Sequence, residues 1–257
     1  MVDKQQTVLI TGGTGKIGAQ LVEYFLSNGN VVVFTGRSKS TVMHLYKSLK
    51  ERVSSKRLYG FAVDFCSAMG VQSLVNKLDE KKLDINSVVH AARSIENLKL
   101  SKGGFVPRKF WQKEFQMDVV VPYELLIGLA AVKKNNLKSF VNISSMYGLV
   151  AANPTLYGNP LMESPIHYNV AKAAQIHLTR ELAVRFSKFG IRVNSIAFGG
   201  VEGRAGEEFK KLYGKMCPIG RMLFDSELSG PVDFLVSDKS NGMTGHVLVV
   251  DGGWTIW

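Results

Sequence analysis

Cysteine and long apolar runs are scarce in this chain. Two of its 257 residues are cysteine, Cys66 and Cys217, so neither a disulfide framework nor a cysteine-based metal site is expected. No run of about 18 apolar residues occurs, which predicts no membrane-spanning helix and no membrane partner. The first residues lack an apolar core with a cleavage site, so we expect a cytoplasmic protein and not a secreted one.

Acidic residues are also in short supply. Against 32 lysines and arginines stand 21 aspartates and glutamates, which gives a formal net charge of +11. A positive field of this size attracts polyanions, but the chain carries no signature of a nucleic-acid recognition module. We therefore expect no nucleic-acid partner. The positive charge is expected to serve a phosphate-bearing cofactor and, in part, to lie on solvated lysines.

Short apolar runs alternate regularly with helical patterns along the whole chain. Such alternation predicts crossover units, and hence an α/β fold of Rossmann type, a doubly wound parallel sheet with helices on both faces. No linker or repeat divides the chain, so we expect one domain over residues 1–257, with irregular segments at about 93–108 and 149–166. The expected strands are 8–10, 31–34, 58–63, 87–90, 140–143, 191–196 and 247–250, and the expected helices are 17–26, 41–53, 71–83, 119–132, 167–188 and 227–236.

A glycine-rich turn follows the first expected strand and opens the first helix. It reads Thr-Gly-Gly-Thr-Gly-Lys-Ile-Gly from Thr11 to Gly18. Glycines let the backbone turn tightly and approach a pyrophosphate, and the helix N-terminus offers free N–H groups to it. In this strand–turn–helix setting we favour a dinucleotide site over an ordinary tight turn. Its predicted residues are Gly12, Thr14, Gly15, Lys16, Ile17 and Gly18.

The residues after the second strand distinguish the two nicotinamide dinucleotides. The segment Phe34-Thr35-Gly36-Arg37-Ser38 has no acid to bind the adenosine ribose, as NAD(H) prefers. Arg37 instead offers a planar fork that matches a 2′-phosphate. We therefore predict NADP(H) in preference to NAD(H), with Arg37 and Ser38 in its site. A solvated surface arginine is the other interpretation of Arg37.

Tyr168 and Lys172 stand four residues apart in an expected helix. Side chains at this spacing lie on one helix face. A positive charge beside a phenol favours the phenolate, so the phenol can exchange a proton while a hydride moves. An ordinary amphipathic helix face would also explain the pair, but the glycine turn supplies the place for a hydride carrier.

Taken together, these patterns resemble the short-chain dehydrogenase/reductase family over essentially the whole chain, from Thr7 to Trp257. The resemblance rests on an ordered set of short segments. They are the glycine turn, Asp64 after the third strand, Asn142-Ile143-Ser144-Ser145, Tyr168 with Lys172, Ile191-Arg192-Val193-Asn194-Ser195, and Asp251-Gly252-Gly253.

The resemblance implies a role for each matching residue. Tyr168 is then the acid/base, Lys172 binds the nicotinamide ribose and activates the tyrosine, and Ser145 holds the substrate oxygen, with Ser144 as the alternative. Asp118 stands where the family has the asparagine that completes its proton relay, and we group it with the catalytic residues. The cofactor is then also contacted by Asp64, Phe65, Ala91, Tyr168, Lys172, Gly199 and Val201.

The chain departs from the family at several of these positions. Lys16 replaces a glycine, and the glycine spacing is similar to the extended branch that holds sugar-nucleotide epimerases and dehydratases. The segment His90-Ala91-Ala92-Arg93 replaces Asn-Asn-Ala-Gly, and Arg93 lacks the backbone freedom of glycine. Asp118 accepts hydrogen bonds but does not donate them while ionised, so we expect an altered relay. Phe198 replaces the proline usual before Gly199.

An insertion at 151–165 lengthens the segment between Ser145 and Tyr168 and is rich in turn formers. With Pro218-Ile219-Gly220-Arg221-Met222 and the Asp-Gly-Gly-Trp-Thr-Ile-Trp tail, it resembles a subgroup linked to bacterial flagellin glycosylation and surface-sugar synthesis. This implies a sugar or nucleotide-sugar substrate, a small molecule bound by loops at about 93–108, 149–166 and 200–222. We expect a lid helix at 207–213.

Further basic residues lie on the loop at 93–108 and at its end. They either meet a substrate phosphate or form a solvated basic loop. His167, beside Tyr168, is either a proton donor or a packing histidine. The basic residues are Arg93, Lys99, Lys102, Arg108 and Lys109.

The preferred function is an NADP(H)-dependent oxidoreductase acting at a hydroxyl or ketone carbon, and no metal is expected. The resemblance also implies a homotetramer or homodimer that pairs the long helices 119–132 and 167–188. Two alternatives stay open. His90, Arg93 and Asp118 are consistent with a cofactor-binding regulator that has lost catalysis, and the glycine spacing with an epimerase or dehydratase.

Overall fold

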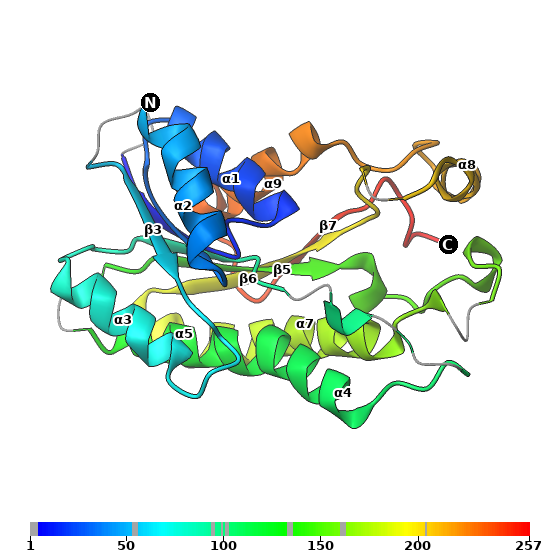
Figure 1. Cartoon of the computed structure of the whole chain (residues 1–257), viewed down its shortest axis with the longest axis horizontal. Coiled ribbons are helices and arrows are strands. Elements are labelled where there is room, and N and C mark those ends of the chain that lie inside the picture. Colours follow the sequence, from blue (N-terminus) through cyan, green and yellow to red (C-terminus); the bar gives the residue numbers. More distant parts are fainter. Residues whose placement is uncertain are drawn as a thin grey trace.

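Parallel strands form one seven-stranded sheet in the order β3-β2-β1-β4-β5-β6-β7 in the computed structural model of the protein (Figure 1). The structure describes residues 5–52, 56–93, 96–98, 100, 103–132, 136–159, 163–203 and 205–257. The order of the strands reverses beside β1, which pairs with both β2 and β4. Ligands of such sheets bind outside the carboxyl ends of the strands at this point. The strands are β1 (Thr7–Thr11), β2 (Val31–Gly36), β3 (Leu58–Ala62), β4 (Ser87–His90), β5 (Ser139–Ser145), β6 (Arg192–Phe198) and β7 (Val247–Val250).

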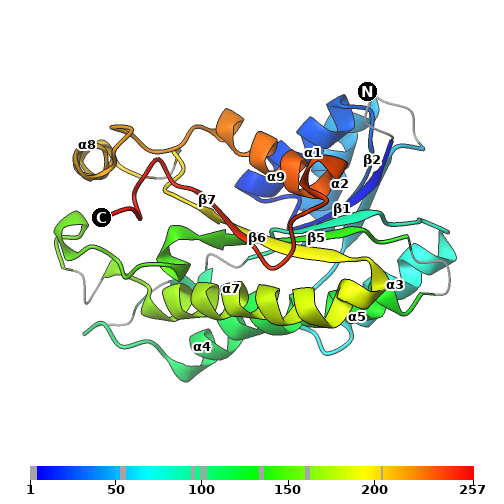
Figure 2. The same cartoon turned by 180° about the vertical axis from the view of Figure 1, so that it is seen from behind.

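Helices cover both faces of the sheet, as Figures 1 and 2 show from opposite sides. One face carries α1 (Lys16–Ser27), α2 (Lys39–Lys50) and α9 (Ser229–Val236). The other carries α3 (Gly70–Glu80), α4 (Arg108–Phe115), α5 (Val121–Ala130) and α7 (Ile166–Phe186). The expected single-domain, doubly wound fold is therefore confirmed.

The apolar runs of the strands have a simple physical origin. In β1, Leu9 packs into the core layer under α3, α5 and α7, whereas Val8 and Ile10 pack into the layer under α1, α2 and α9. Both faces of the strand are thus buried, and its sequence is apolar without alternation. In β5 every residue is buried, including Asn142, which donates to Thr179 Oγ1 at 3.0 Å.

The segment from Arg108 to Ala130 differs from the expectation. The sequence pattern assigns residues 119–132 to a long helix and leaves residues 109–118 unassigned. The structure instead has α4, a π-helical turn (Gln116–Val120) and α5 in direct succession. Among the described helices, none combines the length and the apolar composition needed to cross a membrane.

Outside the carboxyl edge of the sheet lies α8 (Glu207–Met216), beside the C-terminus in both views (Figures 1 and 2). The range of α8 includes the helix that the sequence predicts as a lid at 207–213. Tyr213 of α8 stacks on Trp254 with ring centroids 4.4 Å apart, and its hydroxyl accepts from the Gly200 N–H at 2.9 Å. These contacts fix α8 to the tail and to the segment after β6.

Candidate active site

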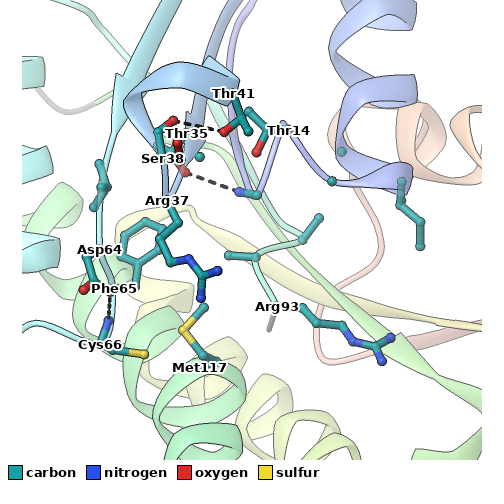
Figure 3. Close-up of a pocket in the computed structure, with 18 of the residues that line it drawn as sticks. Thr14, Thr35, Arg37, Ser38, Thr41, Asp64, Phe65, Cys66, Arg93 and Met117 are labelled. Atoms are coloured by element: carbon teal, nitrogen blue, oxygen red, sulfur yellow. Dashed lines mark hydrogen bonds between the residues drawn. The ribbon is translucent and has the colours of Figure 1, made fainter. Parts of the chain in front are cut away.

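A cavity of about 620 Å³ opens at the carboxyl ends of β1, β2, β3 and β4 (Figure 3). It lies at the point where the strand order reverses, where this class of sheet binds its ligands. The predicted cofactor residues that line it are Gly12, Thr14, Gly15, Lys16, Ile17, Gly18, Arg37, Ser38, Asp64, Phe65 and Ala91. Four predicted cofactor residues, Tyr168, Lys172, Gly199 and Val201, lie outside this lining. Gly199 donates its N–H to Val250 of β7, and Val201 pairs with Leu223.

The glycine turn is tight enough to exclude side chains. Gly12 has a φ of +68°, and a Cβ there would lie 2.6 Å from the Ala92 Cα. A Cβ on Gly18 would lie 2.1 Å from the Gly12 carbonyl oxygen. The glycines therefore let α1 pack against the turn, and the N-cap Gly15 brings no side-chain cap to the first N–H groups of α1. Such a helix terminus is suited to an anion.

Lys16 connects the glycine turn with a segment distant in the sequence. Its Nζ lies 3.1 Å from Asp225 Oδ1, on the segment that leads from α8 to α9. The family's glycine at this position makes no such contact, because it has no side chain. The substitution therefore links the glycine turn to the segment between α8 and α9.

Arg37 does not extend freely into solvent. Its guanidinium forms a two-pronged pair with Glu96, with nitrogen–oxygen distances of 2.8 and 3.3 Å. Both side chains are about two-thirds exposed, and the hydrogen bond to Glu96 raises the pKa of Arg37. A carboxylate thus already occupies the fork that was predicted to bind a 2′-phosphate.

Ser145, Tyr168 and Lys172 are buried at the end of β5 and the start of α7. The four-residue spacing does place the last two on one face, with Lys172 Nζ 5.7 Å from the centroid of the Tyr168 ring. Ser144 Oγ donates to the Lys172 carbonyl at 3.2 Å and joins β5 to α7. Ser145 Oγ accepts from the Tyr147 N–H at 3.2 Å. Within the described part of the chain, neither the Ser145 nor the Tyr168 hydroxyl donates a hydrogen bond, so both protons are available to a ligand.

Lys172 points into the protein. Its Nζ donates to Asp118 Oδ1 at 2.9 Å, to the Ile143 carbonyl at 2.8 Å and to Gln175 Oε1 at 3.3 Å. An ammonium has three N–H donors, and these contacts use all of them. Asp118 is only 1 % exposed and belongs to the π-helical turn. The position of the family's asparagine therefore carries a buried ion pair here.

His90 ends β4 and connects three elements. Its Nδ1 lies 2.9 Å from Thr11 Oγ1, and its Nε2 lies 2.9 Å from the Met117 carbonyl oxygen. A carbonyl only accepts, so Nε2 carries the proton and Nδ1 accepts from Thr11. Burial lowers the pKa of His90 to about 4, and the charge of Lys172 acts in the same direction. The residue is neutral at pH 7. The sequence marked it only as a departure from the family, and its contacts with Thr11 and Met117 were not predicted.

The lowered pKa predicts a pH-dependent stability. As the pH falls below 6.5, a histidine of the unfolded chain takes up a proton, whereas His90 in the folded protein does so only near pH 4. The free energy of unfolding should therefore decrease between these values, by at most about 1.4 kcal/mol per pH unit from this group. His90→Asn, which restores the family's residue, should show a shallower decrease in urea unfolding measured from pH 7 to pH 4.5. Equal slopes in both proteins would contradict this role.

Arg93 lies over the acid/base candidate. Its Cζ is 4.4 Å from the centroid of the Tyr168 ring, and the residue lines the cavity. His167 is fully buried, and its ring lies 6.4 Å from that of Phe110 and 6.1 Å from that of Trp111, contacts that favour the packing interpretation over the proton-donor one. Arg108 begins α4, and Lys109 Nζ lies 5.6 Å from the Phe110 ring. Lys99 and Lys102 fall outside the described residues.

The loop that carries the insertion is anchored close to Ser145. The hydroxyls of Tyr147 and Tyr157 lie 2.9 Å apart, and burial raises the pKa of Tyr147, so this phenol stays protonated. Tyr157 in turn packs edge-on against Phe209 of α8, with ring centroids 6.0 Å apart. The insertion and α8 thus meet at the same end of the sheet. Within the described residues, no group of acidic, histidine or cysteine side chains could hold a metal ion.

Comparison with known proteins agrees with this architecture. The model of one protein family, described as enoyl-(acyl carrier protein) reductase, matches residues 14–255. The flagellin modification protein A of Campylobacter coli is 26 % identical, with 98 % of each chain covered. A sorbose reductase of Candida albicans is 28 % identical over 98 % of this chain and 88 % of its own. A short-chain dehydrogenase of Leptospira borgpetersenii, solved with bound NAD⁺, has a TM-score of 0.83 and 26 % identity over 98 % and 94 % of the two chains.

The chain therefore belongs to the short-chain dehydrogenase/reductase family of oxidoreductases. Members of this family use nicotinamide cofactors on small-molecule substrates. The expected family and fold are confirmed, and the match spans nearly the whole chain.

Proposed function

We propose that this protein is an NADP(H)-dependent reductase or dehydrogenase acting at a hydroxyl or ketone carbon of a sugar or nucleotide-sugar. The observation that carries the proposal is the cluster of Ser145, Tyr168 and Lys172, buried together at the carboxyl end of β5. Two hydroxyl donors and an ammonium suit a reaction in which an oxygen gains or loses a proton. The adjacent cavity has the size and the glycine turn that a dinucleotide needs.

Each residue then has a defined task. The turn from Gly12 to Gly18 and the start of α1 hold the pyrophosphate, and Asp64, Phe65 and Ala91 line the adenosine end. The bound nicotinamide supplies or accepts the hydride. The Ser145 Oγ and Tyr168 Oη hydroxyls hold the substrate oxygen, and Tyr168 gives or takes its proton. Lys172 keeps positive charge beside the phenol, and Asp118 fixes the ammonium through their 2.9 Å contact.

The substrate class rests on the loops and on the relatives. We propose that residues 93–108, 149–166 and 200–222 of this single 1–257 domain surround the substrate, together with α8. The anchored insertion gives that end of the sheet an additional wall. Relatives named as a flagellin modification protein and a sorbose reductase favour a carbohydrate, and we place the reaction in bacterial glycan modification.

The test is absorbance at the reduced-nicotinamide band. Purified protein is mixed with NADPH or NADP⁺ and a panel of sugars and nucleotide sugars, with Tyr168→Phe as the control. Turnover that needs Tyr168 supports an oxidoreductase. Product formation without net change in free NADPH would instead favour the epimerase or dehydratase alternative. Tight NADPH binding without any product would favour a cofactor-binding regulator. The position of Arg93 over the Tyr168 ring is consistent with that alternative.

The preference for NADP(H) rests on Arg37, although a structural relative holds NAD⁺. To bind Arg37, the 2′-phosphate of NADPH must displace Glu96 from the guanidinium. NADH has no 2′-phosphate and can bind without breaking this ion pair. Glu96→Gln should therefore strengthen NADPH binding by about two- to fivefold, the range of one exposed ion pair, and leave NADH binding unchanged. Fluorescence titration of the two cofactors measures the ratio.

The matched control for that titration is Glu23→Gln. Glu23 forms a comparable exposed pair with Arg52, at 2.7 Å, outside the cofactor cavity. This variant should keep the wild-type ratio of NADPH to NADH affinity. If Glu96→Gln also keeps it, Glu96 does not oppose the 2′-phosphate.

We also propose a cytoplasmic homodimer or homotetramer. Apolar side chains are unusually exposed on the outer faces of α5 and α7, and pairing these helices between copies would bury them. The side chains are Tyr123, Ile127, Val170 and Val184. A solution mass equal to one 28.3 kDa chain would contradict this assembly.

A further inference from the structure

The cations of the cofactor crevice differ in whether a carboxylate neutralises them. Lys16 pairs with Asp225 at 3.1 Å, and Arg37 pairs with Glu96 at 2.8 Å. Below the crevice, Lys172 pairs with Asp118 at 2.9 Å. Their charges are therefore largely compensated within the protein.

Arg93 is not compensated in this way. It is exposed, and among the described residues no carboxylate lies within ion-pairing distance of its guanidinium. Lys113 also lines the cavity and has no carboxylate partner in the described part of the chain. Its charge favours the thiolate of Cys66, however, so it lies close to Cys66, at the end of the cavity opposite Tyr168. Arg93 is thus the uncompensated cation at the catalytic end of the crevice.

The position of Arg93 is defined by its contact with Tyr168. The guanidinium carbon lies 4.4 Å from the ring centroid. Stacking on an aromatic ring holds the plane of an arginine and leaves the N–H donors at its edge free for other partners. Figure 3 shows Arg93 extending away from the end of the cavity where Arg37, Asp64 and Cys66 lie, and well apart from Thr14 of the glycine turn. The side chain therefore lies beside the proposed acid/base and away from the end of the cavity that holds Arg37.

We propose that Arg93 binds an anionic group of the substrate, a phosphate ester or a carboxylate, while Tyr168 holds the oxygen of the reacting carbon. This inference rests on the proposed function and narrows its substrate to acidic or phosphorylated sugars. A planar guanidinium binds either oxyanion through two parallel N–H···O bonds. A neutral sugar bound over Arg93 would desolvate the guanidinium without supplying an anion to pair with it. The same residue therefore disfavours neutral substrates.

The family's glycine at this position could not bind an anion through a side chain. A glycine after Ala92 would leave the Tyr168 ring open to solvent and would bring no charge. The arginine adds a cation without displacing Lys172, because Lys172 is held from below by Asp118 and the Ile143 carbonyl. The two cations therefore have separate partners, one inside the protein and one in the substrate.

The test compares three ketoses that differ at a single carbon: L-sorbose, L-sorbose 6-phosphate and 5-keto-D-gluconate, which carries a carboxylate at that position. Each is titrated calorimetrically into the protein with NADP⁺, with NAD⁺ and without cofactor, so that no hydride can be transferred to the ketone; in the cofactor-free titration no hydride transfer of any kind can occur. We expect the wild type to bind at least one of the two anions about 10- to 100-fold more tightly than L-sorbose, the range of a charge-assisted hydrogen-bonded pair. The tighter of the two identifies phosphate or carboxylate as the natural anion.

Variants assign the effect to Arg93. Arg93→Gln should lose the preference for the anion, Arg93→Lys should keep part of it, and cofactor affinity should stay unchanged in both. Arg185→Gln is the matched control, because Arg185 is an exposed arginine at the far end of α7. Equal binding of the three ketoses by the wild type, or a preference that survives Arg93→Gln, would overturn the proposal. Failure of the wild type to bind either cofactor would contradict the proposed function instead, while the cofactor-free titration still decides the role of Arg93.

Discussion

Tyr168→Phe is expected to lower kcat by about 10²- to 10⁴-fold while NADPH binding stays nearly unchanged. This range is what a positioned acid/base side chain contributes to a reaction. Tyr168 is 9 % exposed and packs beneath Arg93, so a phenylalanine fills the same space and only the hydroxyl is removed. The substituted protein keeps a ring under the guanidinium and keeps Lys172 in its ion pair. What it loses is the group that exchanges a proton with the substrate oxygen.

The measurement is single-turnover and steady-state NADPH oxidation, with NADPH affinity measured separately by fluorescence. Tyr24→Phe is a suitable control, since Tyr24 lies on α1 and packs against Phe25, on the face of the sheet opposite α7. It removes a tyrosine hydroxyl without touching the crevice. If Tyr168→Phe turns over within about threefold of wild type, Tyr168 is not the acid/base, and the cluster at the end of β5 needs another explanation. If kcat falls together with NADPH affinity, the lost hydroxyl acts through cofactor binding.

Much of the fold could be predicted because its signals are local. Strands buried on both faces become continuous apolar runs, so β1, β2 and β5 are visible in the sequence. The glycine turn is visible because its backbone leaves no room for a Cβ. The Tyr168–Lys172 pair is visible because helical spacing alone puts both on one face.

The first part of the α4–α5 segment had no such signal. Of the eight residues of α4, the structure buries only Glu114, which is charged. A helix whose buried position carries a carboxylate shows no apolar stripe, and periodicity therefore leaves it unassigned. The π-helical turn that follows contains one residue more per turn than an α-helix. This turn determines which way the Asp118 side chain points, and α-helical periodicity does not predict the turn.

The ion pairs of the site could not be predicted from local sequence patterns either. Arg37 and Glu96 are 59 residues apart, and the fold brings them together only because β2 and β4 both flank β1 in the sheet. The position of Arg37 after β2 indicated a phosphate ligand. No residue close to it in the sequence indicated that Glu96 would compete with the phosphate for its guanidinium. In the same way, Arg93 was recognised as a departure from glycine, but its place over Tyr168 depends on the packing of α7 against the sheet.

Removal of the Asp118 carboxylate is expected to lower the free energy of unfolding more than any substitution on the surface. The side chains of Lys172 and Asp118 are 5 % and 2 % exposed, and Lys172 Nζ lies 2.9 Å from Asp118 Oδ1. Breaking such a buried pair by removing one partner leaves an uncompensated charge and costs about 3–5 kcal/mol. We therefore expect this loss for Asp118→Ala in urea unfolding at pH 7. Asp118→Asn should lose less, because its amide oxygen still accepts from Lys172.

The decisive comparison is the double variant Asp118→Leu with Lys172→Met. Replacing both members of a buried ion pair by apolar side chains removes the desolvation of both charges, and often restores or raises stability. We expect this protein to unfold within about 1 kcal/mol of wild type and to be inactive, since Lys172 no longer supports Tyr168. If Asp118→Ala alone loses less than about 1 kcal/mol, water or a movement of Lys172 compensates its charge. Stability and activity would then separate, because the ion pair would serve to hold the ammonium under Tyr168 and not to hold the fold together.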